Sequence, residues 1–305
     1  MGTLAISATA HGSNYLPEYV AREHGIFASH GLDVPYCPRS PWDGVMHDLA
    51  DGSADLALGG LWVPAMYAGN GRNFVAVAQL NDRFPMAIVT REPVADFTLS
   101  WLLGKTVLAP GQGGGAPGEF TRGLMREAGL EPYQARFIHD LSGLMFRELF
   151  VAGLGDALIA DLGTATELER SGAGHISFRH AAAGGRMPNS VYYVLRERID
   201  ELLPRLVPFV QSIDEAMRQL RDGATGDLTP LFEKEWPESD PDVLADVTGQ
   251  LVENGTWAGT RLDREPCERW TSILHTAGLT VSHVKFESIV DSRASDAAAG
   301  QRRMA

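Results

Sequence analysis

The sequence of 305 residues predicts an α/β protein of two lobes, each built on a mixed sheet flanked by helices, that face each other across a cleft. Three observations support this fold class. Short β-rich runs alternate with amphipathic helical stretches from the N-terminus, the alternation restarts after Pro93, and everything beyond residue 197 has a helical pattern. The length also exceeds that of one average domain, which agrees with two units.

The first lobe is expected to contain five strands and three helices. The strands are predicted at 3–8, 32–37, 55–59, 74–80 and 86–91, and the helices at 15–30, 42–51 and 62–69. Each strand is a short apolar or β-branched run, and each helix carries apolar residues three and four positions apart. Strand and helix alternate as they do in proteins with a mainly parallel sheet.

The second lobe repeats this alternation, and the C-terminal part is helical. Strands are predicted at 105–110, 135–140, 156–161, 175–180 and 191–196, with helices at 117–129, 142–152 and 163–171, then at 197–222, 227–236, 240–253 and 264–278. Two extended crossings, 86–93 and 189–197, are expected to join the lobes as a hinge. The predicted division is residues 1–91 in lobe 1, 92–191 in lobe 2, 192–285 again in lobe 1, and a disordered tail at 286–305.

Composition excludes several classes of function. Lys and Arg number 26 against 39 Asp and Glu, a net charge of -13, so nucleic acid and anionic membranes are poor partners. Two cysteines, Cys37 and Cys267, provide neither a disulfide framework nor a zinc-binding pair. No apolar run is long enough for a membrane helix, so no membrane insertion is expected, and no leader is seen before the first strand. We therefore expect a cytoplasmic location, or a periplasmic or cell-surface one if a leader has been removed.

The glycine-rich turn at 109–118 is the most informative segment. It follows a predicted strand, passes through Gly113, Gly114 and Gly115, and enters a helix with Pro117 in its first turn. Glycines let backbone N–H groups approach a ligand, and a helix N-terminus adds partial positive charge, so a carboxylate or phosphate would be favoured here. The alternative is a loop that only turns the chain. The turn is not a nucleotide-binding loop, because it matches no phosphate-loop pattern.

Other candidate binding residues follow strands of the first lobe. Gly59 and Gly60 end a strand and are followed by Trp62, which suits stacking on a flat ligand, although Trp62 could equally be a core residue. Asn14 and Tyr15 follow the first strand and could donate hydrogen bonds.

Three kinds of charged or titratable side chain complete the predicted site. His11 could act as an acid or base, since histidine titrates near neutral pH, or be a bystander in its loop. Arg83 could bind a carboxylate or lie at the surface. Asp140 and Asp161 each end a predicted strand of the second lobe, where each could face the cleft or cap the next helix.

The order of several motifs resembles one known superfamily. The motifs are YLPEYVAREHGIFASHGLDV (15–34), LADGSADLALGG (49–60), LLGKTVLAP (102–110), the Arg122–Leu130 helix end and GDALIADLG (155–163). Together they resemble type II periplasmic binding proteins, in particular the branch of the thiamine-pyrimidine synthase and the alkanesulfonate, taurine and nitrate receptors. The resemblance covers about residues 3–222. It implies a two-lobed clamp that closes on a small, often anionic or aromatic molecule.

The resemblance leaves two classes of function open, since one fold hosts many sites. Most members are receptors of ABC transporters, but some are enzymes. The sequence departs from two of these enzymes: it has no cysteine cluster or matching histidine as in the pyrimidine synthase, and His11-Gly12 stand where the sulfinate desulfinase has its cysteine. The main expectation is a cytosolic enzyme of lyase type, a decarboxylase or dehydratase acting on a small carboxylated, aromatic or cyclic molecule.

In that enzyme, His11 and Asp161 would handle protons, and no cofactor or metal would be needed. The carboxylate would lie on the amides of the glycine-rich turn and Arg83, with Asp140 nearby and the ring against Trp62 or Tyr15. The alternative is a non-catalytic solute receptor for a small anionic ligand, with an ABC permease as its partner.

Overall fold

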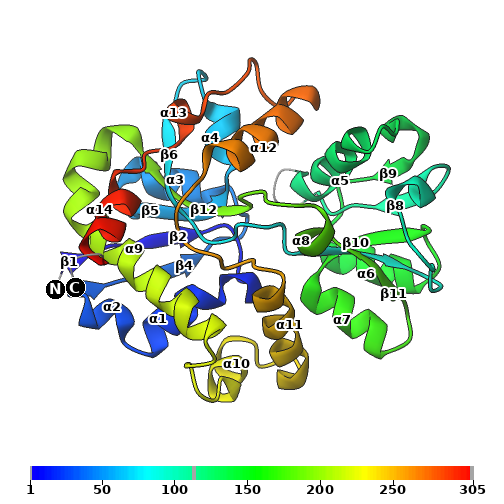
Figure 1. Cartoon of the computed structure of the whole chain (residues 1–305), viewed down its shortest axis with the longest axis horizontal. Coiled ribbons are helices and arrows are strands. Elements are labelled where there is room, and N and C mark those ends of the chain that lie inside the picture. Colours follow the sequence, from blue (N-terminus) through cyan, green and yellow to red (C-terminus); the bar gives the residue numbers. More distant parts are fainter. Residues whose placement is uncertain (1, 112–114, 303–305) are drawn as a thin grey trace.

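The computed structural model describes residues 2–111 and 115–302 of the chain. Figure 1 shows two lobes side by side, each with its own central sheet, and confirms the predicted two-lobed α/β architecture. The alternating strand and helix pattern of the sequence accounts for this division, because each strand run forms one layer and each amphipathic stretch covers it.

The first lobe contains a five-stranded sheet in the order β4-β2-β5-β12-β6. Its strands are β2 (Ile6–Ala8), β4 (Tyr36–Pro38), β5 (Leu56–Gly60), β6 (Phe74–Gln79) and β12 (Ser190–Leu195). β2 pairs in parallel with β4 and β5, whereas β12 is antiparallel to β5 and β6. A small parallel pair, β1 (Gly2–Thr3) and β3 (Leu32–Asp33), lies at the outer end of this lobe.

The helices of the first lobe come from both ends of the chain. The N-terminal ones are α1 (Leu16–Glu23), α2 (Ile26–Ser29), α3 (Gly44–Asp51) and α4 (Trp62–Tyr67). The C-terminal ones are α9 (Ile199–Arg221), α10 (Thr229–Glu235), α11 (Pro241–Glu253), α12 (Arg264–Thr276), α13 (Phe286–Ile289) and α14 (Arg293–Arg302). The long helix α9 packs on α1 and α2, where the fully buried Phe209 stacks on Phe27 with ring centroids 5.6 Å apart.

The second lobe contains a five-stranded sheet in the order β11-β7-β10-β8-β9. Its strands are β7 (Met86–Thr90), β8 (Thr106–Leu108), β9 (Arg136–Ile138), β10 (Ala157–Asp161) and β11 (His175–Arg179), and its helices are α5 (Ala116–Glu127), α6 (Gly143–Val151), α7 (Leu162–Arg170) and α8 (His180–Ala183). β8, β9 and β10 are parallel, and β7 is antiparallel to β10 and β11.

The chain changes lobe at positions that differ from the expected ones. The segment 86–93, predicted as the first crossing, begins with β7 in the second sheet, and 189–197 consists mainly of β12 in the first sheet. The passages between the sheets are therefore the short stretches 80–85 and 184–189. Both predicted crossings have a strand-like sequence, because each of them contains most of a central, buried strand.

The C-terminal segment also differs from the predicted disordered tail. Residues 286–302 include α13 and α14, and α14 packs along α9. Ala294 and Ala298 are almost fully buried there, and Arg293 pairs with Asp200 at 2.8 Å. The small side chains that look aperiodic in the sequence allow a close approach of the two helices, which the local pattern does not reveal.

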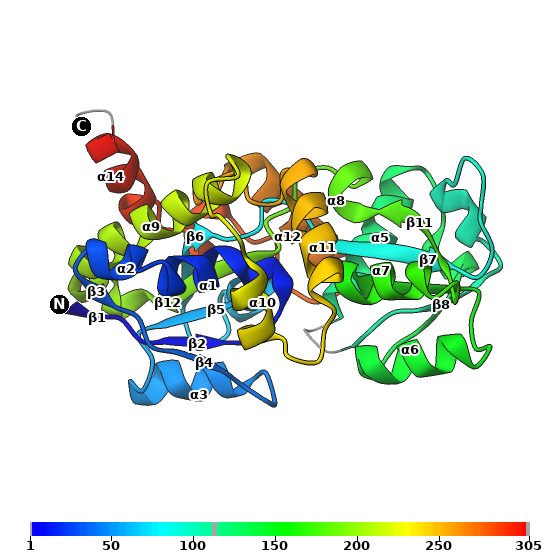
Figure 2. The same ribbon diagram turned by 90° about the horizontal axis from the view of Figure 1, so that it is seen from below.

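Polar contacts on two sides brace the lobes beside the crossings. On one side Arg269 of α12 pairs through two nitrogens with Glu127 of α5, at 2.8 and 2.6 Å. On the other side Arg170 of α7 pairs with Asp246 of α11. Figure 2 shows α11 and α12 lying where the two lobes meet, so the C-terminal helices connect both lobes rather than covering the first alone.

Candidate functional site

A cavity of about 470 Å³ lies between the lobes. The first lobe and the crossings line it with Thr9, Ala10, Asn14, Tyr15, Arg39, Ser40, Pro41, Trp42, Gly60, Trp62, Phe84, Met86, Asn189 and Ser190. The second lobe adds Pro110, Ala116, Pro117, Gly143, Leu158, Ile159, Ala160, Asp161 and Thr164. Many of these residues stand at the carboxyl ends of parallel strands or in the first turns of helices, as is usual for ligand sites of open α/β sheets. Its volume is that of a small-molecule site.

The glycine-rich turn reaches this cavity through the start of α5. Gly113 and Gly114, two of the predicted ligand-binding glycines, lie outside the described residues. Gly115 is the N-cap of α5 with φ 72°, a left-handed conformation that favours glycine, and Ala116 and Pro117 line the cavity. The N-terminus of α5 therefore points its partial positive charge at the cavity, as does that of α6, where Gly143 lines it.

The Gly-Gly-x-Trp segment that ends β5 places one of its glycines and its tryptophan at the cavity. A Cβ on Gly60 would lie 2.1 Å from Nε1 of Trp62, so only glycine allows the indole to fold over this strand end. Trp62 is 7% exposed and lies edge-on to Trp42, with ring centroids 5.0 Å apart and an interplanar angle of 74°. Gly59 is packed against Thr9 and Tyr193 and is outside the lining set.

Of the three candidate residues that follow β2, two lie at the cavity and one does not. Asn14 and Tyr15 line the cavity, and the Tyr15 hydroxyl lies 3.5 Å from Oγ1 of Thr9. Burial raises the pKa of Tyr15, so the side chain stays a neutral phenol. His11, the predicted acid or base, turns the other way: its Nε2 lies 2.9 Å from Oε2 of Glu235 on α10.

The arginine that lines the cavity is Arg39 and not the predicted Arg83. Arg83 donates to the carbonyl oxygen of Ala181 at 3.0 Å and is outside the lining set. Arg39, which sequence reasoning missed, lines the cavity and donates through Nε and Nη2 to both oxygens of Asp48. Asp48 also accepts from the Ser7 hydroxyl at 2.5 Å, and the hydrogen bonds from Arg39 lower its pKa. This pair holds the guanidinium in one orientation, and Nη1 is not used by it.

The two candidate aspartates take different places. Asp161 lines the cavity and caps α7, because its oxygens accept from Thr164 N at 3.0 Å and Thr164 Oγ1 at 2.7 Å. Asp140 is exposed, has φ 75° and is outside the lining set. His11 and Asp161, the expected proton-handling pair, are therefore not brought together.

Several lining residues had no sequence signal that identified them. Arg39 and Trp42 lie in the loop between β4 and α3, where the pattern indicates only a helix start. Asn189 and Ser190 lie at the second crossing, within a run expected to be a plain connection. Their position after a parallel strand, or at a passage between lobes, is the only available signal.

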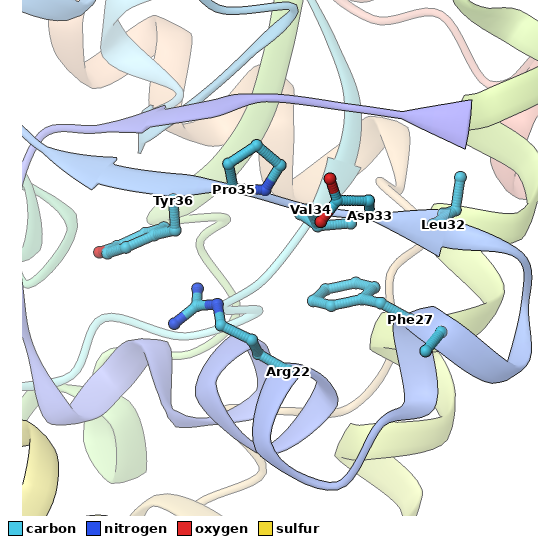
Figure 3. A pocket seen from close by; sticks show the side chains of 8 residues that line it. Arg22, Phe27, Leu32, Asp33, Val34, Pro35 and Tyr36 are labelled. Atoms are coloured by element: carbon cyan, nitrogen blue, oxygen red, sulfur yellow. The ribbon is translucent and has the colours of Figure 1, made fainter. Parts of the chain in front are cut away.

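A second hollow of about 390 Å³ lies on the first lobe alone. Figure 3 shows the Arg22 guanidinium reaching toward the Tyr36 ring, with Phe27 and Pro35 on either side of the gap. Arg22 lies 4.7 Å from the centroid of Tyr36 and donates to the buried Glu18 at 2.9 Å. Because residues of only one lobe line this hollow, whereas both lobes line the other one, the interlobe cavity is the better candidate.

The family follows from comparison with known proteins. Residues 12–222, more than two thirds of the chain, match the family described as NMT1/THI5 like. The chain belongs to the NMT1/THI5-like family. A search of curated proteins matches this NMT1/THI5-like chain to YtlA of Bacillus subtilis (strain 168), named as a binding protein, at 24% identity over 293 residues, which cover 94% of this chain and 86% of YtlA.

Solved structures share the fold across the whole chain. The periplasmic aliphatic sulphonate-binding protein SsuA of Escherichia coli has a TM-score of 0.76 at 16% identity, over 94% of this chain and 96% of that one. The ligand-binding component of an ABC-type import system of Staphylococcus aureus, with zinc bound, has a TM-score of 0.75 at 12% identity, over 98% of this chain and 99% of that one. The fold is that of type II periplasmic binding proteins, as the resemblance implied.

These relatives correct the main functional expectation. A lyase-type enzyme is contradicted, because YtlA, SsuA and the Staphylococcus aureus protein are named as binding proteins or as a component of an import system. The cytoplasmic location also finds no support among them, since SsuA is described as periplasmic. Among the residues that the structure describes, no helix has the length and apolar character needed to cross a membrane.

Proposed function

We propose that this chain is a solute-binding receptor that captures a small anionic molecule between its lobes and passes it to an ABC-type importer on the outer side of the membrane. The observation that carries the proposal is the cavity between the lobes, which is lined by Arg39, held by Asp48, and by the first residues of α5 and α6. A fixed guanidinium and the partial positive charge of helix N-termini suit a carboxylate or sulfonate.

Electrostatics within the cavity support an anion over a cation. Asp161 is the one carboxylate among the described lining residues, and Thr164 already engages both of its oxygens. Asp48 accepts from Nε and Nη2 of Arg39, which leaves Nη1 outside this pair. The names of the relatives, a sulphonate-binding protein and an importer component, agree with this choice.

A binding panel tests the proposal. Isothermal titration calorimetry with nitrate, methanesulfonate, benzoate and benzenesulfonate should show 1:1 binding of at least one anion, and mass spectrometry should recover that anion unchanged. Arg39→Lys keeps the charge but loses the bidentate support from Asp48, so it should weaken binding about tenfold. Arg83→Ala is the matched control and should bind normally, because Arg83 lies outside the cavity. Multiple turnover of a ligand, or no binding of any anion, would overturn the receptor function.

A further inference from the structure

Helix α11 lies between two elements that line the interlobe cavity. It packs on one side against the short helical turn Ser13–Tyr15 of the first lobe, and on the other side against α7 of the second lobe. Figure 2 shows α11 beside α7. Asn14 and Tyr15 of the turn line the cavity, as does Thr164 of α7. No residue of α11, which the structure describes in full, belongs to the lining set, so α11 supports both cavity walls from outside.

On the first lobe, the segment that follows α11 is hydrogen-bonded to the lining turn. Nε1 of Trp257, 1% exposed, donates to the backbone carbonyl oxygen of Asn14 at 3.1 Å. The turn before Trp257 is fastened to α11, because the amide of Thr256 donates to the carbonyl oxygen of Leu251 at 3.0 Å. α11 and this turn, residues 241–257, therefore form one hydrogen-bonded unit, which we call the bridge. Four apolar side chains of α11 are buried in the same cluster as Tyr15 and Trp257: Val243, Leu244, Val247 and Leu251.

On the second lobe, Gln250 attaches the bridge with both ends of its side-chain amide. Its Oε1 accepts from Nε of Arg179 at 3.0 Å, and its Nε2 donates to Oγ1 of Thr166 at 3.4 Å. Since a guanidinium can only donate, Arg179 determines which end of the amide faces it, and the other end is left to donate to Thr166. Thr166 is 5% exposed and stands two positions after the lining residue Thr164. Gln250 thus connects the bridge to the helix that begins at the cavity.

We propose, on the basis of the receptor function above, that the bridge sets the separation of the two cavity walls and thereby the affinity for the ligand. Gln250 and Trp257 are positioning residues: neither of these two described residues belongs to the lining set, and each acts through an element that does. Walls held at a fixed separation cost the ligand little ordering on binding, so releasing the bridge at either end lowers affinity. The family match ends at residue 222, so the bridge lies in the part of the chain that the match does not cover.

A double-mutant cycle tests the bridge by calorimetry with nitrate, methanesulfonate, benzoate and benzenesulfonate. Trp257→Phe keeps an aromatic ring but removes the donor to Asn14, and Gln250→Ala removes both contacts to the second lobe. Each variant should raise the dissociation constant of any anion that the wild type binds about fivefold. If both act through one bridge, the double variant should also bind about fivefold more weakly than wild type, whereas independent effects would multiply to about twenty-five-fold.

Phe27→Leu is the control for lost stability. Phe27 is 3% exposed and stacks on Phe209 outside the cavity lining, so this variant should lower the free energy of unfolding and still bind the anions as the wild type does. Denaturant unfolding compares its stability with that of Trp257→Phe and Gln250→Ala.

The outcomes separate the two proposals. Single variants that bind as tightly as wild type or more tightly, multiplying effects in the double variant, or an equal loss of affinity in Phe27→Leu would each overturn the positioning role while the receptor function stands. If the wild type binds none of the four anions, the receptor function and the positioning role fail together.

Discussion

Gly60 and Trp62 are sterically interlocked: a methyl group on residue 60 would lie 2.1 Å from the indole nitrogen and 2.2 Å from Cδ1. The end of strand β5 and the start of helix α4 thus allow one position of the Trp62 ring. Because that ring lines the interlobe cavity, the geometry of a glycine decides the shape of the binding site.

Gly60→Ala tests this relationship. The new methyl group must push the Trp62 ring away, so we expect a loss of about 1–3 kcal/mol in the free energy of unfolding and a clear weakening of ligand binding. Denaturant titration and calorimetry measure the two effects. Gly249→Ala, inside helix α11 with nothing within 4 Å of its new Cβ, is the control and should be neutral or slightly stabilising. Normal binding by Gly60→Ala would show that the Trp62 position is unimportant for the ligand.

Glu18 should make stability depend on pH. Burial raises the pKa of Glu18 from 4.5 to about 7, although Arg22 and Tyr192 both bind its carboxylate. A raised carboxyl pKa means that the folded state holds the proton more tightly than the unfolded chain does. The contribution of this proton to the free energy of unfolding is full below about pH 4.5 and is lost as pH rises to about 7. The change is about 3 kcal/mol.

Glu18→Gln removes this titration. Urea unfolding at several pH values between 4.5 and 7 should show wild-type stability falling, relative to the variant, as pH rises. Taking the difference between the two proteins cancels the other titrating groups they share. Parallel stability curves for wild type and variant would mean that the folded-state pKa of Glu18 is ordinary.

Ala298 tests whether the C-terminal segment belongs to the fold. It is fully buried where α14 packs on α9, so Ala298→Glu would bury an unpaired carboxylate. We expect the free energy of unfolding to fall by about 3 kcal/mol, as measured by thermal or denaturant unfolding. The neighbouring Ala297 is exposed, and Ala297→Glu should leave stability within about 0.5 kcal/mol of wild type. Equal stability of the two variants would indicate a detached tail.

Arg269 should matter for how the lobes are held together. It joins Glu127 on α5 and also donates to the carbonyl oxygens of Gly184 and Arg186 beside the second crossing. Arg269→Ala leaves these carbonyl groups without their donor, so we expect the free energy of unfolding to fall by about 1–3 kcal/mol. This loss should exceed that of Glu127→Gln, which removes only the ion pair.

The same variants distinguish the two kinds of contact. The Glu127 effect should shrink in high salt, because both side chains of the pair are partly exposed, whereas the loss of the carbonyl contacts should persist. Chemical denaturation at low and high salt measures both. A loss of the same size in the two variants would place the whole effect in the ion pair.

Local patterns in the sequence predicted much of this architecture. The alternation of strand and helix, the restart after Pro93 and the order of the motifs predicted two α/β lobes and the superfamily, because period-two and period-3.6 patterns depend on neighbours in the chain. Glycine followed by a helix start also marked positions that lie at the cavity, including Gly60 and the beginning of α5.

The sequence by itself thus determined the fold class, the family and the strand ends from which a site could be built. Tertiary structure alone decided which side chains reach that site: Asp48 holds Arg39 at the cavity, Glu235 holds His11 away from it, and α9 buries α14. His11 and Glu235 are separated by 224 positions, and Arg39 is positioned by a residue on a different element. No local periodicity encodes such pairs, because they form only when separate elements of the fold pack against one another.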